Sequence, residues 1–298
     1  MENDNKFKSD INKEFLNNES IGEYCQFGTG GRARYLFVAL KIESLIESIL
    51  FAQANRIPYC VIGSGAGLLF GDKDYNGLII INRSSTINCI PENNIVVCDS
   101  GVKISQLASF TAQRNLSGLE NFMGFPGTVG GSVYGNACSD RLCFGSFIRW
   151  MTILTHRGRI VKKDARWFEF IPRSCKLQKK LYLKQWTILT VAMQLCYRRY
   201  DEIQKDLFKA NNANSRLKDK GLLCDIFCSR NEEISHRDIY PNIARGNKVI
   251  LAQDNRCIRN IGGASSASAR KLIEDIVEKS VESGRNFEDK IEYLGKWQ

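Results

Sequence analysis

A run of closely spaced glycines near the middle of the chain is the segment best suited to bind a ligand. Residues 118–136, here called the signature segment, read GLENFMGFPGTVGGSVYGN. Its central glycines flank Pro126, a pattern typical of a Pro-Gly turn followed by a loop whose backbone can approach a ligand closely. Successive N–H groups in such a loop bind anions, so the segment predicts a phosphate site.

Two further glycine loops precede the signature segment. The first glycine loop, residues 27–34, reads FGTGGRAR, and the second glycine loop, residues 63–67, reads GSGAG. The second is similar to a Rossmann dinucleotide fingerprint, which requires a helix directly after its glycines. The turn-rich residues 71–77 follow instead, so we expect this loop to connect two strands. An ordinary tight connection without a ligand is the alternative interpretation.

The hydrophobic pattern around these loops predicts alternating strands and helices. Ile42, Leu45, Ile46, Ile49 and Leu50 form the stripe of an amphipathic helix. With the strands on either side it makes a βαβ unit over residues 35–63. Further strands are expected at residues 78–81, 94–101, 147–155, 160–163 and 186–197, and helices at residues 103–115 and within the polar residues 198–220.

The C-terminal part of the chain contains the clearest helical pattern. Its apolar face comprises Leu272, Ile273, Ile276, Val277 and Val281, and the serines at 265, 266 and 268 are candidate N-caps. Residues 287–294 are expected to form a strand. Side chains alternate along a strand, so Glu288, Lys290 and Glu292 would then share one face.

Composition limits the classes of protein that the chain can represent. With 298 residues and 43% hydrophobic content, it is expected to form about two domains. No apolar run approaches the roughly 20 residues of a membrane-spanning helix. Residues 1–20 form a polar leader without the features of a secretory signal, so a cytoplasmic location is expected. A net charge of +10 favours an anionic partner, although no nucleic-acid-binding signature is present.

The cysteines suggest neither a disulfide framework nor a metal site. There are eleven, scattered from Cys25 to Cys257 without a C-x-x-C pair, and an odd number cannot all pair within the chain. We expect buried free thiols. Cys224 and Cys228 have the spacing closest to a metal motif, but neither histidine lies at a matching distance, so no metal is predicted.

Taken together, the three glycine loops resemble the UDP-N-acetylenolpyruvoylglucosamine reductase (MurB) family. The signature segment is similar to that family's G-L-E-x-x-x-G-I-P-G-T-V-G-G-A-V-x-x-N-A motif. The resemblance implies an α+β protein: a FAD-binding module of PCMH/VAO type with two α/β subdomains, then a smaller α+β substrate domain. The corresponding boundaries are residues 21–199 for the FAD-binding domain, divided at about residues 21–86 and 87–199, and residues 200–298 for the C-terminal domain.

The resemblance also implies which residues hold the cofactor. Ala66 and Gly67 stand where the family usually has Ser-Asn, a difference expected to weaken FAD binding by removing side-chain hydrogen bonds. The residues implied to bind FAD are Gly30, Gly31, Gly63, Ser64, Gly65, Ala66, Gly67, Leu68, Gly124, Phe125, Pro126, Gly127, Thr128, Gly130, Gly131 and Asn136.

Three catalytic positions follow from the same resemblance. Arg173 falls at the family's arginine, although Pro172 and Cys175 replace its neighbours. Asp225 falls at the serine proton donor, with Ser229 as an alternative. Lys290 falls at the C-terminal glutamate, with Glu288 or Glu292 reached by a two-residue shift. In addition, Asn260 matches a family asparagine and Asp254 falls at a family histidine.

The implied activity is the NADPH-dependent reduction of UDP-N-acetylglucosamine enolpyruvate to UDP-N-acetylmuramate in peptidoglycan synthesis. FAD and NADPH are the implied cofactors and a UDP-sugar the substrate, in a protein expected to be a monomer without a nucleic-acid or membrane partner. Because two catalytic positions differ, the alternative is a catalytically silent flavin or UDP-sugar binding protein with a regulatory or scaffold role.

Overall fold

The structure is a computed structural model, which describes residues 14–139, 142–179, 181–223, 227–229, 249–251, 257–282 and 287–297. Its internal contacts divide the chain into two compact units. Unit 1 comprises Met1–Phe15, Phe37–Ser64 and Leu78–Lys218, and unit 2 comprises Leu16–Leu36, Gly65–Gly77 and Asp219–Gln298. The division falls within strands β2 (Arg32–Ala39) and β5 (Tyr75–Asn82). The domain boundaries expected from the sequence stay a prediction.

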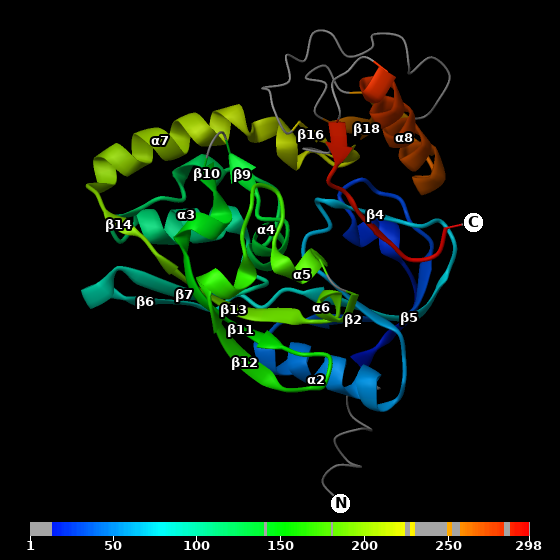
Figure 1. Ribbon diagram of the computed structural model, residues 1–298, viewed down its shortest axis with the longest axis horizontal. Coiled ribbons are helices and arrows are strands. Elements are labelled where there is room, and N and C mark those ends of the chain that lie inside the picture. Colours follow the sequence, from blue (N-terminus) through cyan, green and yellow to red (C-terminus); the bar gives the residue numbers. More distant parts are fainter. Residues whose placement is uncertain are drawn as a thin grey trace, which may run out of the picture. The chain divides into compact units, whose positions relative to one another are not determined.

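Unit 1 is built on a five-stranded antiparallel sheet with the order β12-β11-β13-β7-β6. The strands are β6 (Ile87–Ile90), β7 (Ile95–Asp99), β11 (Ile148–Leu154), β12 (Ile160–Asp164) and β13 (Thr187–Gln194). In Figure 1, α3 (Ile104–Ala112), α4 (Val129–Tyr134) and α7 (Tyr200–Ala213) lie on one side of this sheet. Apolar side chains of these helices and of the strands form one buried cluster.

The helices of this layer form because their apolar residues repeat with the period of a helix. In α3 the buried residues are Ile104, Leu107, Ala108, Thr111 and Ala112, which follow the i, i+3, i+4, i+7, i+8 spacing. The remaining elements of unit 1 are α2 (Ile42–Ala54), α5 (Lys176–Lys179), α6 (Leu181–Lys184), β3 (Tyr59–Ile62), β8 (Leu116–Ser117), β9 (Cys138–Ser139), β10 (Leu142–Cys143) and β14 (Cys196–Tyr197). Strand β3 pairs in parallel with β5.

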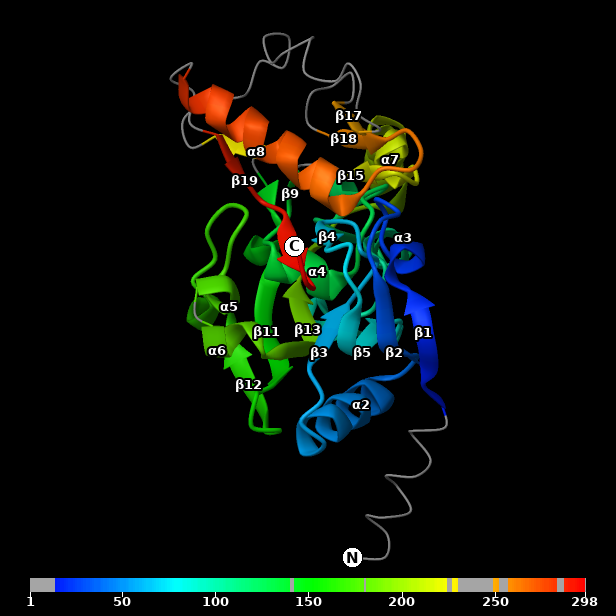
Figure 2. The ribbon, with the colours of Figure 1, turned by 90° about the vertical axis from the view of Figure 1, so that its right-hand side faces the viewer.

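Unit 2 combines short strands with one long helix, α8 (Ser266–Glu282). Its strands are β1 (Leu16–Ser20), β4 (Leu68–Phe70), β15 (Leu222–Leu223), β16 (Phe227–Ser229), β17 (Val249–Leu251), β18 (Ile258–Asn260), β19 (Phe287–Asp289) and β20 (Glu292–Leu294). Strand β1 pairs with the first part of β2, and β18 lies between β15 and β17. Figure 2 shows β19 beside α8. In the buried cluster of this unit, Phe27 of the first glycine loop and Leu69 of β4 lie together with apolar residues of α8.

Several sequence expectations were wrong in detail. Leu50 and Val281 were assigned to buried helix faces, but they are 39% and 56% exposed. Residues 287–294 form two strands rather than one, since β19 pairs with β16 and β20 pairs with β4. Glu288, Lys290 and Glu292 therefore do not lie on one face of a continuous strand. Strand β1 lies within residues 1–20, which were expected to be a polar leader, and β6 and α4 were not predicted as a strand and a helix. The mixed α+β fold class is confirmed.

The expectation of free thiols was also wrong for one pair, because Cys138 and Cys143 form a disulfide. These residues lie opposite one another in the hairpin of β9 and β10, so the fold brings the sulfurs together although the sequence shows no paired motif. Within the described part of the chain, no helix is both long and apolar enough to cross a membrane.

Candidate cofactor and substrate site

In unit 1 the second glycine loop begins in direct contact with the signature segment. A Cβ atom added to Gly63 would overlap Thr128 Oγ1 and lie 3.1 Å from Thr128 Cγ2. The Gly63 carbonyl accepts a hydrogen bond of 2.8 Å from Arg83 Nη1, which fixes the loop from the end of β5. A side chain at position 63 would require Thr128 to move, because the two segments are in contact there.

The middle of the signature segment forms the start of α4, where the sequence predicted a loop. Thr128 is the N-cap residue, and its Oγ1 accepts from Gly131 N–H at 3.4 Å. The Gly130 N–H donates to Ser100 O at 2.8 Å, and a Cβ atom on Gly130 would lie 2.9 Å from Ser100 Cβ. At Gly131 the packing is looser, since the nearest atom to an added Cβ is 3.6 Å away. The N–H groups of both glycines are already engaged within unit 1, by Thr128 Oγ1 and by Ser100 O.

The first half of the signature segment is held by residues from outside it. Asn214, at the end of α7, donates to the carbonyls of Asn121 and Met123 at 3.2 and 2.8 Å. A Cβ atom on Gly124 would lie 2.8 Å from Asn214 Cβ, and Gly124 has a positive φ of 89°. A glycine at this position therefore satisfies both the close packing and the backbone conformation.

A buried carboxylate fixes the start of the same segment. Glu120 Oε2 accepts from Gly118 N–H at 2.7 Å, and Arg198 Nη1 lies 3.9 Å from Glu120 Oε1. Arg198 also contacts Asp206 Oδ2 of α7 at 2.7 Å. Glu120 therefore holds the start of the signature segment, because its carboxylate accepts the Gly118 N–H and faces the Arg198 guanidinium.

The end of the signature segment holds the turn that carries Arg173. Asn136 Nδ2 donates to Ile171 O at 2.6 Å, and Cys175 Sγ donates to Tyr134 O at 3.2 Å. Burial raises the pKa of the Cys175 thiol to about 11, so the thiol remains a neutral donor. The structure therefore brings Arg173 close to the predicted cofactor segment, from which it is separated by 37 positions in the sequence.

The backbone at Arg173 is strained. Its φ of 60° lies in the left-handed region, which costs a non-glycine residue roughly 1–2 kcal/mol. Such a conformation persists where surrounding contacts fix it, and it is frequent at functional sites.

Of the predicted cofactor residues, Gly30, Gly31 and residues 65–68 lie in unit 2. A Cβ atom on Gly30 would lie 3.2 Å from Phe70 Cβ, and one on Gly31 would overlap the backbone of Lys73. The first glycine loop is thus packed against the segment that follows Leu68. At Gly67, by contrast, no atom lies within 4 Å of an added Cβ, so the backbone there is open to a ligand. The cofactor-binding roles expected for Ser64 and Ala66 stay a prediction.

The C-terminal acid segment reaches the second glycine loop through β20. Glu292 lies opposite Leu68 in the parallel pairing, and its N–H donates to Gly67 O at 3.2 Å. Lys290 precedes this strand, after a bend at which Asp289 Oδ1 accepts from Ile291 N–H at 3.1 Å. Burial raises the pKa of Asp289, with a smaller opposing effect of its hydrogen bonds and of Lys290. Of the two alternatives to Lys290, Glu292 is the one whose backbone the structure places at the loop.

Asp72, which follows β4, contacts the N-terminus of α8, and no sequence pattern predicted this contact. Its two carboxylate oxygens accept from Ser266 N–H and Ala267 N–H at 2.7 and 2.8 Å. The predicted serine cap is confirmed as well, because Ser265 Oγ accepts from Ser268 N–H at 3.0 Å. Asn260 donates to Phe27 O at 3.2 Å and so holds the first glycine loop.

Some predicted site residues cannot be placed. Asp225 and Asp254 lie outside the described residues. Ser229 lies in β16 and Glu288 in β19, where the structure describes the backbone but not these side chains. Arg83, Ser100 and Asn214, which position the loops of unit 1, were missed because they lie far from the loops in sequence and carry no motif.

Comparison with known proteins identifies the module to which these loops belong. Residues 33–164 match the family model described as FAD binding domain. A UDP-N-acetylenolpyruvoylglucosamine reductase of Caldicellulosiruptor saccharolyticus is 28% identical over 97% of this chain and 94% of its own length. That of Chlamydia muridarum is 26% identical over 92% of each chain. The crystal structure of the enzyme from Thermus caldophilus has a TM-score of 0.75 at 20% identity, covering 94% of this chain and 98% of that one.

The protein therefore contains an FAD-binding domain, with the signature segment and second glycine loop inside it. The relatives match nearly the whole chain and not only this domain. The chain is thus similar, over nearly its whole length, to UDP-N-acetylenolpyruvoylglucosamine reductases (MurB).

The glycine loops fit the requirements of a flavin dinucleotide. A pyrophosphate needs backbone N–H groups that it can approach without side chains in the way. In unit 2 no atom lies within 4 Å of a Cβ added to Gly67, whereas in unit 1 Gly63 and Gly130 are closed by neighbouring atoms. The assignment of individual glycines to FAD stays a prediction.

Proposed function

We propose that the protein is an FAD-dependent reductase that uses NADPH to convert UDP-N-acetylglucosamine enolpyruvate to UDP-N-acetylmuramate. The observation that carries the proposal is the match to reductases over nearly the whole chain, together with an FAD-binding domain at residues 33–164. Residues 21–199 would bind FAD and residues 200–298 the UDP-sugar. When bound, FAD would supply hydride chemistry between NADPH and the enolpyruvyl double bond.

Arg173 is the residue proposed to meet the developing negative charge on the substrate. Reduction of the enolpyruvyl group places charge beside a carboxylate, and a fixed guanidinium stabilises such charge without reorganisation. The strained turn at Arg173 and its attachment to the signature segment support this role, because both fix the position of the residue.

The proton donor is proposed to be Asp225, with Ser229 as its alternative. A carboxylic acid can donate a proton at neutral pH only when burial or a nearby negative charge raises its pKa. Lys290 would stabilise the enolate by charge, whereas a carboxylic acid at that end of the chain would be Glu288 or Glu292. The contact of Glu292 with Gly67 favours Glu292 among these two.

The test is the rate of NADPH oxidation by the purified protein with and without UDP-N-acetylglucosamine enolpyruvate. We expect the substrate to accelerate oxidation, and Arg173→Ala to remove most of that acceleration while leaving bound FAD in place. A protein that retains FAD but shows no substrate-dependent rate would reject the reductase assignment.

The same experiment distinguishes a second candidate, a silent flavin or UDP-sugar binding protein. The specific observation in its favour is that Lys290 and Asp225 stand where the family carries a glutamate and a serine. This candidate predicts binding of UDP-sugar to the FAD-loaded protein without any change in the rate of NADPH oxidation.

A further inference from the structure

The turn that carries Arg173 is short and needs outside support. Ile171 and Ser174 exchange two backbone hydrogen bonds of 3.1 and 3.0 Å, with Pro172 and Arg173 between them. Proline followed by a residue with positive φ is the sequence of a type II turn, in which glycine or asparagine usually takes the second place. Arginine in that place, with φ of 60°, requires neighbouring contacts that hold the turn.

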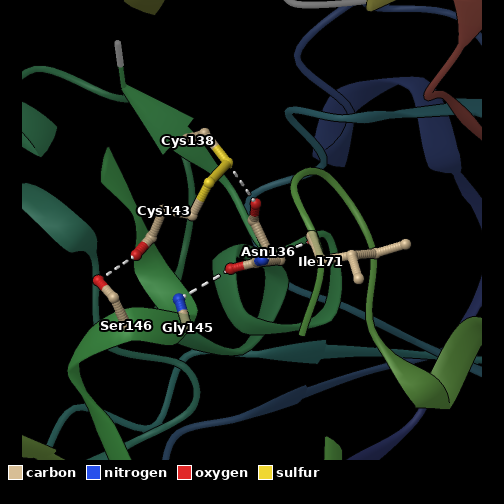
Figure 3. The surroundings of a disulfide bond; sticks show 6 residues. All are labelled: Asn136, Cys138, Cys143, Gly145, Ser146 and Ile171. Atoms are coloured by element: carbon tan, nitrogen blue, oxygen red, sulfur yellow. Dashed lines mark hydrogen bonds between the residues drawn. A yellow bond between two sulfur atoms is a disulfide. The ribbon is translucent and has the colours of Figure 1, made fainter. Parts of the chain in front are cut away.

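Asn136 provides one of these contacts. Figure 3 shows its side chain between two backbone groups, with Nδ2 donating to Ile171 O at 2.6 Å and Oδ1 accepting from Gly145 N–H at 2.8 Å. The residue is only 2% exposed. Because both ends of the amide are engaged by different segments, its orientation is fixed by the fold.

The disulfide holds the segment on the other side of Asn136. Cys138 and Cys143 lie opposite one another in the β9–β10 hairpin and are covalently joined. Phe144 N–H donates to Ala137 O at 2.8 Å, which continues the hairpin toward Gly145. A Cβ atom on Gly145 would lie 2.8 Å from Asn136 Oδ1, so the two residues are in close contact. The disulfide thus fixes the Gly145 amide that orients Asn136.

We propose that Asn136 is a positioning residue for Arg173 and that the Cys138–Cys143 disulfide keeps Asn136 in place. Asn136 holds the Ile171 carbonyl, and through it the left-handed conformation of Arg173. The consequence for turnover rests on the proposed function, whereas the effect on the turn does not. A dithiol such as dithiothreitol would reduce the pair to two thiols, forming its own cyclic disulfide, and would thereby loosen the turn.

Asn136→Asp is the variant that separates the two contacts of Asn136. A carboxylate still accepts from Gly145 N–H, but it cannot donate to Ile171 O. The matched control is Asn88→Ala, which changes an exposed residue of β6 in the same unit.

The first measurement follows the turn without any need for activity. Trypsin cleavage after Arg173 is compared with cleavage after Arg157, an exposed residue of the β11–β12 connection, in the FAD-loaded protein. We expect Asn136→Asp to raise the ratio of the two rates about tenfold, the change that a lost hydrogen bond typically produces. An unchanged ratio in Asn136→Asp would overturn the proposal. A general loss of stability would raise both rates and leave the ratio near the wild-type value.

The second measurement is a double-mutant cycle on kcat with Arg173→Ala. We expect Asn136→Asp to lower kcat in the wild type and to have no further effect when Arg173 is absent, with the FAD dissociation constant unchanged within about twofold. Additive losses, or a tenfold weaker affinity for FAD, would show that Asn136 acts elsewhere and would reject the proposal. If the wild type has no substrate-dependent turnover, the proposed function fails, and the cleavage ratio still decides the positioning role.

The disulfide is tested with the double variant Cys138→Ser/Cys143→Ser. Reduction with dithiothreitol, followed by alkylation and desalting, should raise the cleavage ratio in the wild type and in the control Cys196→Ser, which changes an exposed free thiol. The double variant should match the reduced wild type before and after treatment. A cleavage ratio that reduction does not change in the wild type would contradict the role of the disulfide.

Discussion

Gly63→Ala should destabilise unit 1 because the second glycine loop packs directly against Thr128. The added methyl group would overlap Thr128 Oγ1 and approach Cγ2 to 3.1 Å, so the threonine must move. Overpacking of this kind costs about 1–3 kcal/mol. Moving Thr128 also weakens its hydrogen bond to Gly131 N–H, and loss of an N-cap costs about 1 kcal/mol. We therefore expect a total loss of about 3 kcal/mol in the free energy of unfolding.

Urea denaturation of the FAD-free protein, followed by tryptophan fluorescence, measures this change. Trp150, Trp167 and Trp186 all lie in unit 1 and report its unfolding. Gly131→Ala is the control within the same unit, since the nearest atom to its added Cβ lies at an ordinary contact distance of 3.6 Å. We expect this control to change stability by less than about 0.5 kcal/mol.

A double-mutant cycle tests whether the loss arises from the contact between residues 63 and 128. Thr128→Ala alone should cost about 1 kcal/mol through the lost cap. In that background the obstructing hydroxyl and methyl groups are absent, so Gly63→Ala should cost less than about 1 kcal/mol. Equal costs of Gly63→Ala in both backgrounds would show that the loss does not arise from the contact with Thr128.

Three further predictions concern other parts of the chain. Asp72→Ala should lower the stability of unit 2 by about 1–2 kcal/mol, because α8 loses two N-terminal hydrogen bonds. Urea denaturation followed by Trp297 fluorescence, in a background in which the three tryptophans of unit 1 are replaced by phenylalanine, measures this loss, and no change would contradict the cap. Burial raises the pKa of Cys175 from 9.0 to about 11, so its contribution to stability is complete below pH 9 and is lost as pH rises through about 11. Cys175→Ser should flatten that alkaline loss in urea titrations, and an identical pH profile would refute the assignment. Lys290→Glu should raise kcat if position 290 is the acid site, whereas unchanged or lower turnover would favour Glu292.

The sequence predicted most of the local structure because the apolar periods are regular. The helix at residues 42–54 and the hairpin of β11 and β12 were expected from spacing alone. The C-terminal strand was the clear failure, since its alternation continues through Lys290 while its pairing partner changes from β16 to β4. A change of partner depends on tertiary contacts that a local pattern does not contain.

The parts of the candidate site at which glycines allow close backbone contact could be predicted from the sequence. The parts that depend on one side chain bonding to a residue distant in sequence could not. Gly63 and Gly130 were predicted to line a ligand, and the structure explains their type by neighbouring atoms that leave no room for a Cβ. The roles of Asp72 and Asn214 depend on partners more than 90 positions away, so no spacing could reveal them. The disulfide was missed for a related reason, because the hairpin and not a motif brings Cys138 and Cys143 together.

The most direct test of the central proposal is the visible spectrum of the purified protein under anaerobic conditions. We expect flavin absorption bands that NADPH bleaches and that UDP-N-acetylglucosamine enolpyruvate then restores. Bands that NADPH bleaches but that remain bleached after addition of this substrate would contradict the reductase function, and a protein unable to bind FAD would contradict the site itself.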